Sequence, residues 1–296
     1  MPLPTMQAGT TIRGIASMLL AGVFLVTNDA IIKTLVSHYP VGQILCLQAA
    51  CIAILTGLWL RAIGKPILRF ANPRGHLARG LLYVVGSFAF VTALNYLPLG
   101  EVIAIAFAGP LFLTLFGRLI LKEHVGPHRL AAVVIGFIGV VIMMRPSPNM
   151  HWAVFLPILV ALADGLRDII TRTTTVGESS QRIVFSTAGI LCLAGAVTAV
   201  GGDWVAIASD HVLRFIVSSC AFVLAHYFLV ESFRHAQTVI VAPFRYTQLV
   251  WGILIGWYFF GETLDTPIFF GAGIIIAAGL YIGWREAVHA RRTQTL

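Results

Sequence analysis

A charged and an amide side chain stand within a long apolar stretch near the C-terminus. Arg245 and Gln248 occur in the run from about 239 to 260, which is long enough to cross a bilayer at roughly 20 residues per span. An arginine inside a span costs about 2.5–3.5 kcal/mol on insertion scales, so it is kept where it faces a protein interior or a watered cavity. We therefore predict that this stretch lines a cavity, where Arg245 donates hydrogen bonds to an anionic or carbonyl-rich ligand.

Three neighbours extend the chemistry of Arg245. Gln248 lies three positions further on and on the same helical face, Trp251 continues that stripe, and Tyr246 lies beside it. A glutamine amide donates and accepts hydrogen bonds, which suits the edge of a heterocycle, and aromatic faces suit a flat ring. We predict that Arg245, Gln248, Tyr246 and Trp251 bind the substrate.

Structural roles are the alternatives for these residues. Arg245 could form an ion pair with Asp164, Asp168 or Glu231, or extend its guanidinium toward the membrane surface. Gln248 and the aromatic residues could pack between helices or anchor the chain at the interface.

A second group of polar residues stands in two other apolar runs. Asp29 and Lys33 lie at i and i+4, so they could pair along one helix face, or Asp29 could carry a proton. His226 lies near the middle of its run, and histidine titrates close to neutral pH. We predict proton-coupling or gating roles for Asp29, His226 and Lys33, and substrate contacts for Asn28 and Tyr227. The alternative for His226 is a histidine that is only hydrogen-bonded.

Further charged residues have local structural explanations. Asp164, Arg167 and Asp168 lie at i, i+3 and i+4, which predicts an ion-pair cluster on one helix face. Glu123 and Glu262 each follow an apolar run, so we expect both to be structural residues at the ends of spans.

The composition indicates an integral membrane protein. Of the 296 residues, 58% are hydrophobic and only 11% are charged, whereas soluble domains have about 25% charged residues. The formal net charge is +8, but the basic residues lie in short loops between apolar runs. They indicate membrane topology and contact with anionic lipid headgroups, and we expect no binding of nucleic acid.

Neither a cofactor nor a metal site is predicted from motifs. The four cysteines fall in apolar runs without a C-x-x-C pair, which predicts small buried residues rather than a zinc site or a disulfide framework. The sequence contains no G-x-S-x-G, Walker A or H-E-x-x-H motif. We therefore predict that the chain is not an enzyme.

The apolar runs predict an all-α membrane protein with ten transmembrane helices. Their approximate ranges are 12–36, 41–63, 77–96, 101–121, 130–144, 152–171, 183–200, 212–233, 239–260 and 268–284. Gly109-Pro110 predicts a kink in the fourth span. Glycines in the fifth and tenth spans predict close helix packing.

A constant shift in residue number relates the two halves of the chain. The shift that moves Asp29–Lys33 onto Asp168–Arg172 also moves Ser87-Phe88 onto His226-Tyr227 and Glu123 onto Glu262. We call it the repeat shift, and we predict two five-helix repeats, at residues 1–146 and 147–296. Because five is odd, the repeats should lie in the membrane with opposite orientations.

The loop charges are consistent with this inversion. With the N-terminus inside, 15 of the 20 Lys and Arg residues lie on the cytoplasmic side. The positive-inside rule therefore predicts that both termini are cytoplasmic.

At this point the pattern resembles a known family. Ten spans in two inverted halves are similar to the EamA branch of the drug/metabolite transporter superfamily, and the resemblance covers almost the whole chain. The local motifs that resemble the family and its subgroup of riboflavin and S-adenosylmethionine importers are Lys122-Glu123, Phe260-Gly261-Glu262, Pro243-Phe244-Arg245-Tyr246, Asn28-Asp29-Ala30 with Lys33, and Tyr39-Pro40-Val41-Gly42-Gln43-Ile44.

The resemblance implies a secondary transporter in a bacterial inner membrane, with a small-molecule substrate bound between the repeats and released by alternating access. Riboflavin uptake is the first substrate hypothesis. Alternatives are an S-adenosylmethionine importer, an exporter of metabolites, drugs or amino acids, and a channel built from several copies of the chain. Partners are the substrate and the lipid bilayer, and a homodimer is left open.

Overall fold

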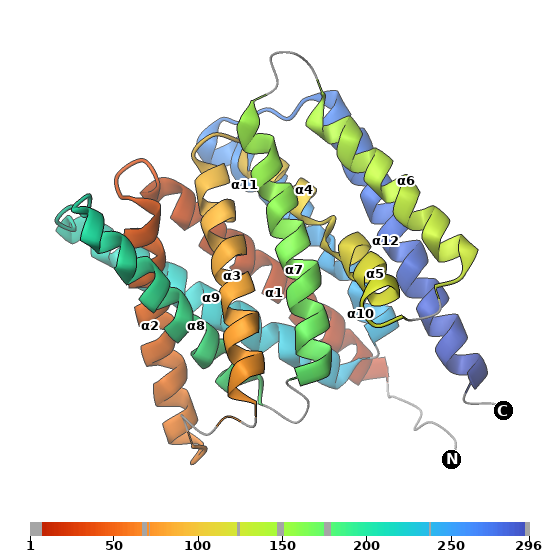
Figure 1. Ribbon diagram of the computed structural model, residues 1–296, viewed down its shortest axis with the longest axis horizontal. Coiled ribbons are helices and arrows are strands. Elements are labelled where there is room, and N and C mark those ends of the chain that lie inside the picture. Colours follow the sequence, from red (N-terminus) through yellow and green to blue (C-terminus); the bar gives the residue numbers. More distant parts are fainter. Residues whose placement is uncertain are drawn as a thin grey trace.

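The protein is built from helices. The computed structural model describes residues 8–66, 70, 72–122, 125–146, 151–174, 179–236 and 238–293, with side chains left out at 8–9, 172–174, 238–239, 242 and 286–293. All regular elements within these ranges are helical (Figure 1). They are α1 (Ala8–Leu35), α2 (Val41–Ala62), α3 (Pro73–Leu94), α4 (Leu99–Ala106), α5 (Gly109–Leu119), α6 (Pro127–Met144), η1 (Trp152–Val154), α7 (Phe155–Thr174), α8 (Ser180–Val197), η2 (Thr198–Gly201), α9 (Ser209–His235), α10 (Thr238–Arg245), α11 (Thr247–Phe260) and α12 (Thr266–Thr293).

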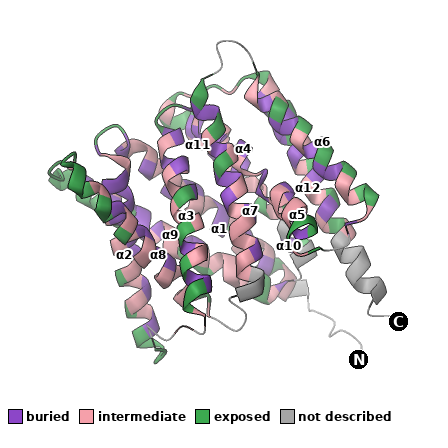
Figure 2. Cartoon of the chain, viewed as in Figure 1, coloured by how far each residue is buried: buried purple, intermediate pink, exposed green. Residues whose placement is uncertain are grey.

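Eight spans within the described ranges are long and apolar enough to cross a membrane. Two predicted spans are not among them: α7 has 20 residues but contains the charged cluster at 164–168, and the stretch 238–260 is divided between α10 and α11. Large apolar side chains cover the outside of the bundle, for example Leu193 at 71% and Phe270 at 69% exposed (Figure 2). Lipid must solvate such a surface, so the chain is a multi-pass membrane protein.

Two predicted spans are broken near their middle. The expected kink at Gly109-Pro110 is confirmed, because α4 ends at Ala106 and α5 starts at Gly109. The stretch 239–260, predicted as one span, is instead two helices that meet at Tyr246. Pro243 lies three residues before the break, and proline removes a backbone donor and clashes with the preceding turn.

Each long helix of the first half packs against a helix of the second half. α1 packs on α9, α2 on α8, α3 on α7, and α6 on α12. The predicted close packing of the fifth and tenth spans is confirmed at α6 and α12, where a Cβ on Gly139 would lie 2.8 Å from the carbonyl oxygen of Gly271. Glycines at the contact allow the backbones of two helices to approach each other this closely.

Several helix boundaries recur at the repeat shift found in the sequence. The boundaries that it relates are the starts of α2 and α8 (Val41 and Ser180), of α4 and α10 (Leu99 and Thr238) and of α6 and α12 (Pro127 and Thr266), and the ends of α1 and α7 (Leu35 and Thr174). Figure 1 places the start of α1 and the end of α12 on the same side of the bundle. We call this the terminal side and the opposite side the far side.

Candidate functional site

A cavity of about 860 Å³ lies between the two halves of the bundle. Its volume is in the range of pockets that enclose small organic molecules. Helices α1 to α5 and α7 to α12 all contribute to its lining. The polar and aromatic side chains that line it are Asn28, Asp29, Gln48, Arg79, Tyr83, Ser87, Phe90, Phe107, Asp164, Arg167, Asp168, Thr187, Phe222, His226, Arg245, Tyr246, Gln248 and Trp284.

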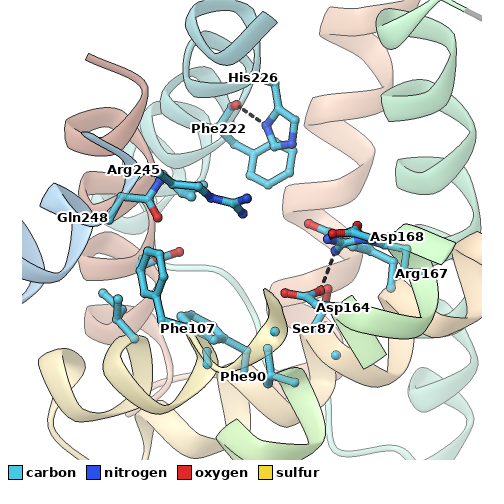
Figure 3. A pocket seen from close by; sticks show the side chains of 18 of the residues that line it. Ser87, Phe90, Phe107, Asp164, Arg167, Asp168, Phe222, His226, Arg245 and Gln248 are labelled. Carbon is cyan, nitrogen blue, oxygen red and sulfur yellow. Dashed lines mark hydrogen bonds and ion pairs between the residues drawn. The ribbon is translucent and has the colours of Figure 1, made fainter. Parts of the chain in front are cut away.

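Arg245 points into this cavity from the last residue of α10 (Figure 3). The acids considered as its structural partners bind other groups: Asp164 and Asp168 contact Arg167, and Glu231 contacts Arg234. Within the described part of the chain, the Arg245 guanidinium has neither an ion pair nor a hydrogen bond. Its five N–H donors are therefore available to a ligand.

The predicted cluster on α7 is confirmed and faces the same cavity. Arg167 lies 2.6 Å from the Oδ1 atom of Asp164, and its NH2 nitrogen lies 3.1 Å from the Oδ1 atom of Asp168. Arg167 also lies over the ring of Tyr83, 5.9 Å from the ring centroid. The two carboxylates are 35% and 41% exposed, so a ligand can reach them.

Asn28 and Asp29 line the cavity within a chain of amide hydrogen bonds. Gln48 Nε2 donates to Asn28 Oδ1 at 2.5 Å, and Asn28 Nδ2 donates to Asp29 Oδ1 at 3.0 Å. The proposed pair between Asp29 and Lys33 is wrong, because Lys33 has a different acidic partner. Asp29 is thus bound by a neutral amide, and no cationic partner is found among the described residues.

Lys33 lies outside the cavity, near the far-side end of α1. Its Nζ atom is 2.7 Å from Glu262 Oε1 and donates to the carbonyl oxygen of Leu97 at 2.7 Å. Glu262 Oε2 accepts a hydrogen bond from the backbone of Leu99 at 2.8 Å. This arrangement joins α1 to the loops that precede α4 and follow α11. Glu262 lies just after the end of α11, as expected, whereas Glu123 lies outside the described residues.

The remaining predicted residues divide between the cavity and its surroundings. Tyr246, Gln248 and His226 line the cavity, and the Nδ1 atom of His226 is 3.0 Å from the carbonyl oxygen of Phe222. That bond makes Nδ1 the donor and leaves Nε2 without the proton in the neutral ring.

Tyr227 and Trp251 do not reach this cavity. Tyr227 lines a smaller cavity of about 260 Å³ and lies against Trp59, with 5.6 Å between the ring centroids. Trp251 packs against the apolar core, although Gln248, three residues earlier in the same helix α11, lines the cavity. Both substrate-contact predictions therefore have no support from the geometry.

Sequence reasoning missed several lining residues, among them Gln48, Arg79, Tyr83, Phe90 and Phe107. The repeat shift could have found Phe107, whose counterpart Tyr246 was predicted, and it also relates further lining residues to one another. The related pairs include Gln48 and Thr187, Tyr83 and Phe222, Ser87 and His226, and Phe107 and Tyr246. The last two rings also contact each other across the halves, at 5.3 Å between centroids. Arg79 donates to the hydroxyls of Thr171 and Thr187.

Comparison with known proteins gives the family. The model of the EamA-like transporter family matches residues 12–145. A riboflavin transporter from Rhizobium johnstonii is 31% identical over 235 residues, which cover 79% of this chain and 78% of the relative. This chain belongs to the EamA-like transporter family.

Two further similarities extend over nearly the whole chain. An S-adenosylmethionine uptake transporter from Rickettsia prowazekii is 29% identical over 280 residues, which cover 94% of each chain. The crystal structure of another protein matches with a TM-score of 0.60 and 15% identity, covering 94% of this chain and 98% of that chain. The structural similarity supports the helical fold of this EamA member. Among the described residues, no group of three His, Cys, Asp or Glu residues could hold a metal ion.

Proposed function

We propose that this EamA member is a secondary transporter that takes up riboflavin by alternating access. The observation that carries this proposal is the Arg245 guanidinium, which is free to bind a ligand in a cavity walled by aromatic rings and amides. A flat ring with carbonyl groups at its edge fits such a lining, because aromatic faces stack on it and Arg245 donates to its oxygens. The similarity to a riboflavin transporter over 79% of the chain supports the same substrate.

Two inverted five-helix repeats, at 1–146 and 147–296, would provide the moving parts. The helix boundaries that recur at the repeat shift support the repeats, and so does the order of packing between them. The repeat shift relates α1 to α7 and α3 to α9, so the contact of α1 with α9 corresponds to the contact of α7 with α3. The pairs α2 with α8 and α6 with α12 each join a helix to its own counterpart in the other half. Figure 1 supports the inversion, since α1 leaves the terminal side and α7 runs toward it.

The cavity extends toward the terminal side, whereas an ion pair lies across its far side, and alternating access needs such a difference between the two ends. Lining residues extend toward the terminal side, to Arg79 near the start of α3 and Trp284 in the second half of α12. At the far side, Lys33 and Glu262 join α1 to two loops. We assign this ion pair as the far-side gate, closed here, which must break for the cavity to open on that side.

The orientation follows from the loop charges. Both termini would be cytoplasmic in a bacterial inner membrane, so the far-side gate would face outward and the closed gate would mark the inward-open state. Asp29 and His226 are the groups we propose for proton coupling, since both line the cavity. A homodimer stays a prediction.

S-adenosylmethionine is the alternative substrate that a specific observation favours. Asp29 lines the cavity with only the Asn28 amide as its hydrogen-bond partner among the described residues, so its carboxylate could attract a cationic ligand. The similarity to an S-adenosylmethionine uptake transporter over 94% of the chain supports the same alternative. For that substrate, Asp29→Asn should abolish binding to the purified protein, which no proton gradient drives, whereas riboflavin binding should depend more on Gln248 and the aromatic residues.

Uptake of radiolabelled riboflavin in a bacterium that can neither make nor import it tests the proposal. Wild-type protein should restore growth with saturable uptake, Arg245→Ala should abolish both, and Arg61→Ala should change neither. Arg61 is the matched control because it lies in the last turn of α2, exposed and outside both cavities. If well-expressed wild-type protein shows no uptake, riboflavin is excluded as its substrate. Labelled S-adenosylmethionine would then be tested in the same cells.

A further inference from the structure

A free guanidinium and two carboxylates face the cavity from opposite sides. Arg245 presents only donors from α10, whereas Asp164 and Asp168 present acceptors from α7 on the other side of the space (Figure 3). Phe90 and Phe107 lie between these sides. A ligand that satisfies both sides must therefore have hydrogen-bond acceptors at one end, donors at the other, and an apolar face between them.

The carboxylates of α7 retain unused acceptor capacity. Each binds Arg167 through its Oδ1 atom, and no partner of either Oδ2 atom is found within the described ranges. An ionised carboxylate offers about four lone-pair positions, and in a membrane-embedded cavity unmet positions are costly. A ligand group that donates hydrogen bonds would satisfy the free oxygens.

Helix packing fixes this acidic face toward the cavity. Gly165 follows Asp164 directly, and a Cβ at this position would lie 2.8 Å from the Cβ atom of Phe112 in α5. The backbone of α7 therefore lies tightly against α5 at this level, which sets the rotation of the helix. On that helix Asp164 and Asp168 are one turn apart and share a face.

The internal repeat indicates that the fold does not need the charges of Asp164, Arg167 and Arg245, whereas Asp168 corresponds to a second cavity carboxylate, Asp29. Positions related by the repeat shift line the cavity in both halves, yet three of the charged residues correspond to uncharged ones. The three pairs are Leu25 and Asp164, Asn28 and Arg167, and Ala106 and Arg245. Because the same scaffold is built in the first half with apolar or amide side chains at these three positions, the charges of Asp164, Arg167 and Arg245 are best explained by what the cavity holds.

We propose that Asp164 and Asp168 are specificity-determining residues that bind the hydroxyl-rich end of the substrate, while Arg245 binds the carbonyl edge of its ring. The ligand class is a flat heteroaromatic ring with a polyol chain. This inference rests on the proposed function, since riboflavin combines such a ring with a ribityl chain of four hydroxyls. Each hydroxyl can donate to a carboxylate oxygen and accept from a neighbouring group.

The structural alternative is that the cluster only neutralises Arg167 within the membrane. Both explanations predict that loss of a carboxylate affects the protein, so expression or total activity alone cannot separate them. The preference of a variant for one ligand over another separates the two explanations, because loss of a structural residue affects the uptake of all ligands alike. The informative ligand is lumiflavin, which has the same ring system with a methyl group in place of the ribityl chain.

The test measures uptake of both flavins by wild-type protein and by Asp164→Asn, Asp168→Asn and Arg245→Ala at matched expression. Wild-type protein should prefer riboflavin over lumiflavin. Each Asp→Asn variant should reduce that preference about tenfold, through a higher KM for riboflavin with lumiflavin uptake retained, since a hydrogen bond to a charged group has about that effect. Arg245→Ala should weaken uptake of both flavins equally, because they share the ring.

Each other outcome overturns the inference in a distinguishable way. An Asp→Asn variant that keeps the wild-type preference, or loses both flavins equally, refutes a polyol contact and leaves riboflavin transport intact. Wild-type protein that takes up neither flavin refutes the proposed substrate and the polyol assignment with it. Retained lumiflavin uptake in the same variant shows that the protein has folded, so a selective loss of riboflavin cannot be attributed to misfolding.

Discussion

Replacing Glu262 by glutamine should open the far side of the cavity. The Glu262 carboxylate lies 2.7 Å from Lys33 Nζ and accepts from the backbone of Leu99 at 2.8 Å. Glutamine preserves the shape and one acceptor but removes the charge. The side chains of Lys33 and Glu262 are only 13% and 14% exposed, so solvent screens their attraction weakly.

The magnitude follows from the contacts that are lost. A hydrogen bond to a charged group contributes about 1.5–3 kcal/mol, and 1.4 kcal/mol corresponds to a tenfold change in an equilibrium. If the pair exists only in the state closed on the far side, Glu262→Gln should shift the population toward the opposite state by about 10- to 150-fold. Glu262→Ala, which also loses the bond to Leu99, should shift it further.

Thiol labelling measures this shift. Ser87 lines the cavity, so a cysteine at position 87 in a background without Cys46, Cys51, Cys192 and Cys220 reports access to it. A membrane-impermeant reagent added outside the cell should label Ser87→Cys slowly in the otherwise wild-type protein and faster after Glu262→Gln. The swapped pair Lys33→Glu with Glu262→Lys should restore slow labelling only in part, because the exchanged groups no longer match the carbonyl oxygen of Leu97 and the backbone N–H of Leu99. Equal labelling rates with and without Glu262→Gln would refute the far-side gate.

Two further predictions concern packing and the amide network. Gly271→Ala should lower the Tm of purified protein, since a Cβ there would lie 2.5 Å from the carbonyl oxygen of Gly139, and such overpacking costs about 1–3 kcal/mol. Gly273→Ala, with no atom within 4 Å of its Cβ, is the control, and an equal Tm for both variants would contradict the close packing of α6 and α12. Gln48→Leu removes the donor to Asn28 and should raise the KM for riboflavin about tenfold at matched expression, whereas Gln43→Leu, outside the cavity, should leave KM unchanged. An unchanged KM in Gln48→Leu would show that the hydrogen bond between Gln48 and Asn28 does not contribute to substrate binding.

The sequence was sufficient to predict the helical membrane fold and the cavity-facing role of Arg245. Both follow from local rules, because a span needs a minimum apolar length and an arginine inside it needs a polar surrounding. The kink at Gly109-Pro110 and the cluster around Arg167 were predictable for the same reason, since they depend on residues within one or two turns.

The failed predictions depend on contacts between distant segments. Lys33 has a possible partner one helical turn away in Asp29, yet it pairs with Glu262 in the other half of the chain, because the packing of α1 beside the end of α11 brings them together. Trp251 was assigned to the stripe of Arg245 on the assumption of one continuous helix. Gln248 does line the cavity, but Trp251, three residues further along α11, already packs against the apolar core, and helical spacing alone does not tell where the cavity ends.

Counterflow in liposomes containing the purified protein tests the central claim most directly. Vesicles loaded with unlabelled riboflavin are diluted into a trace of labelled riboflavin, and a carrier then accumulates label transiently above the outside concentration. We predict this overshoot for wild-type protein and for Arg61→Ala, and none for Arg245→Ala. Label that only equilibrates with wild-type protein would indicate a channel. A lack of entry, or an unchanged overshoot with Arg245→Ala, would contradict a riboflavin carrier that binds its substrate at Arg245.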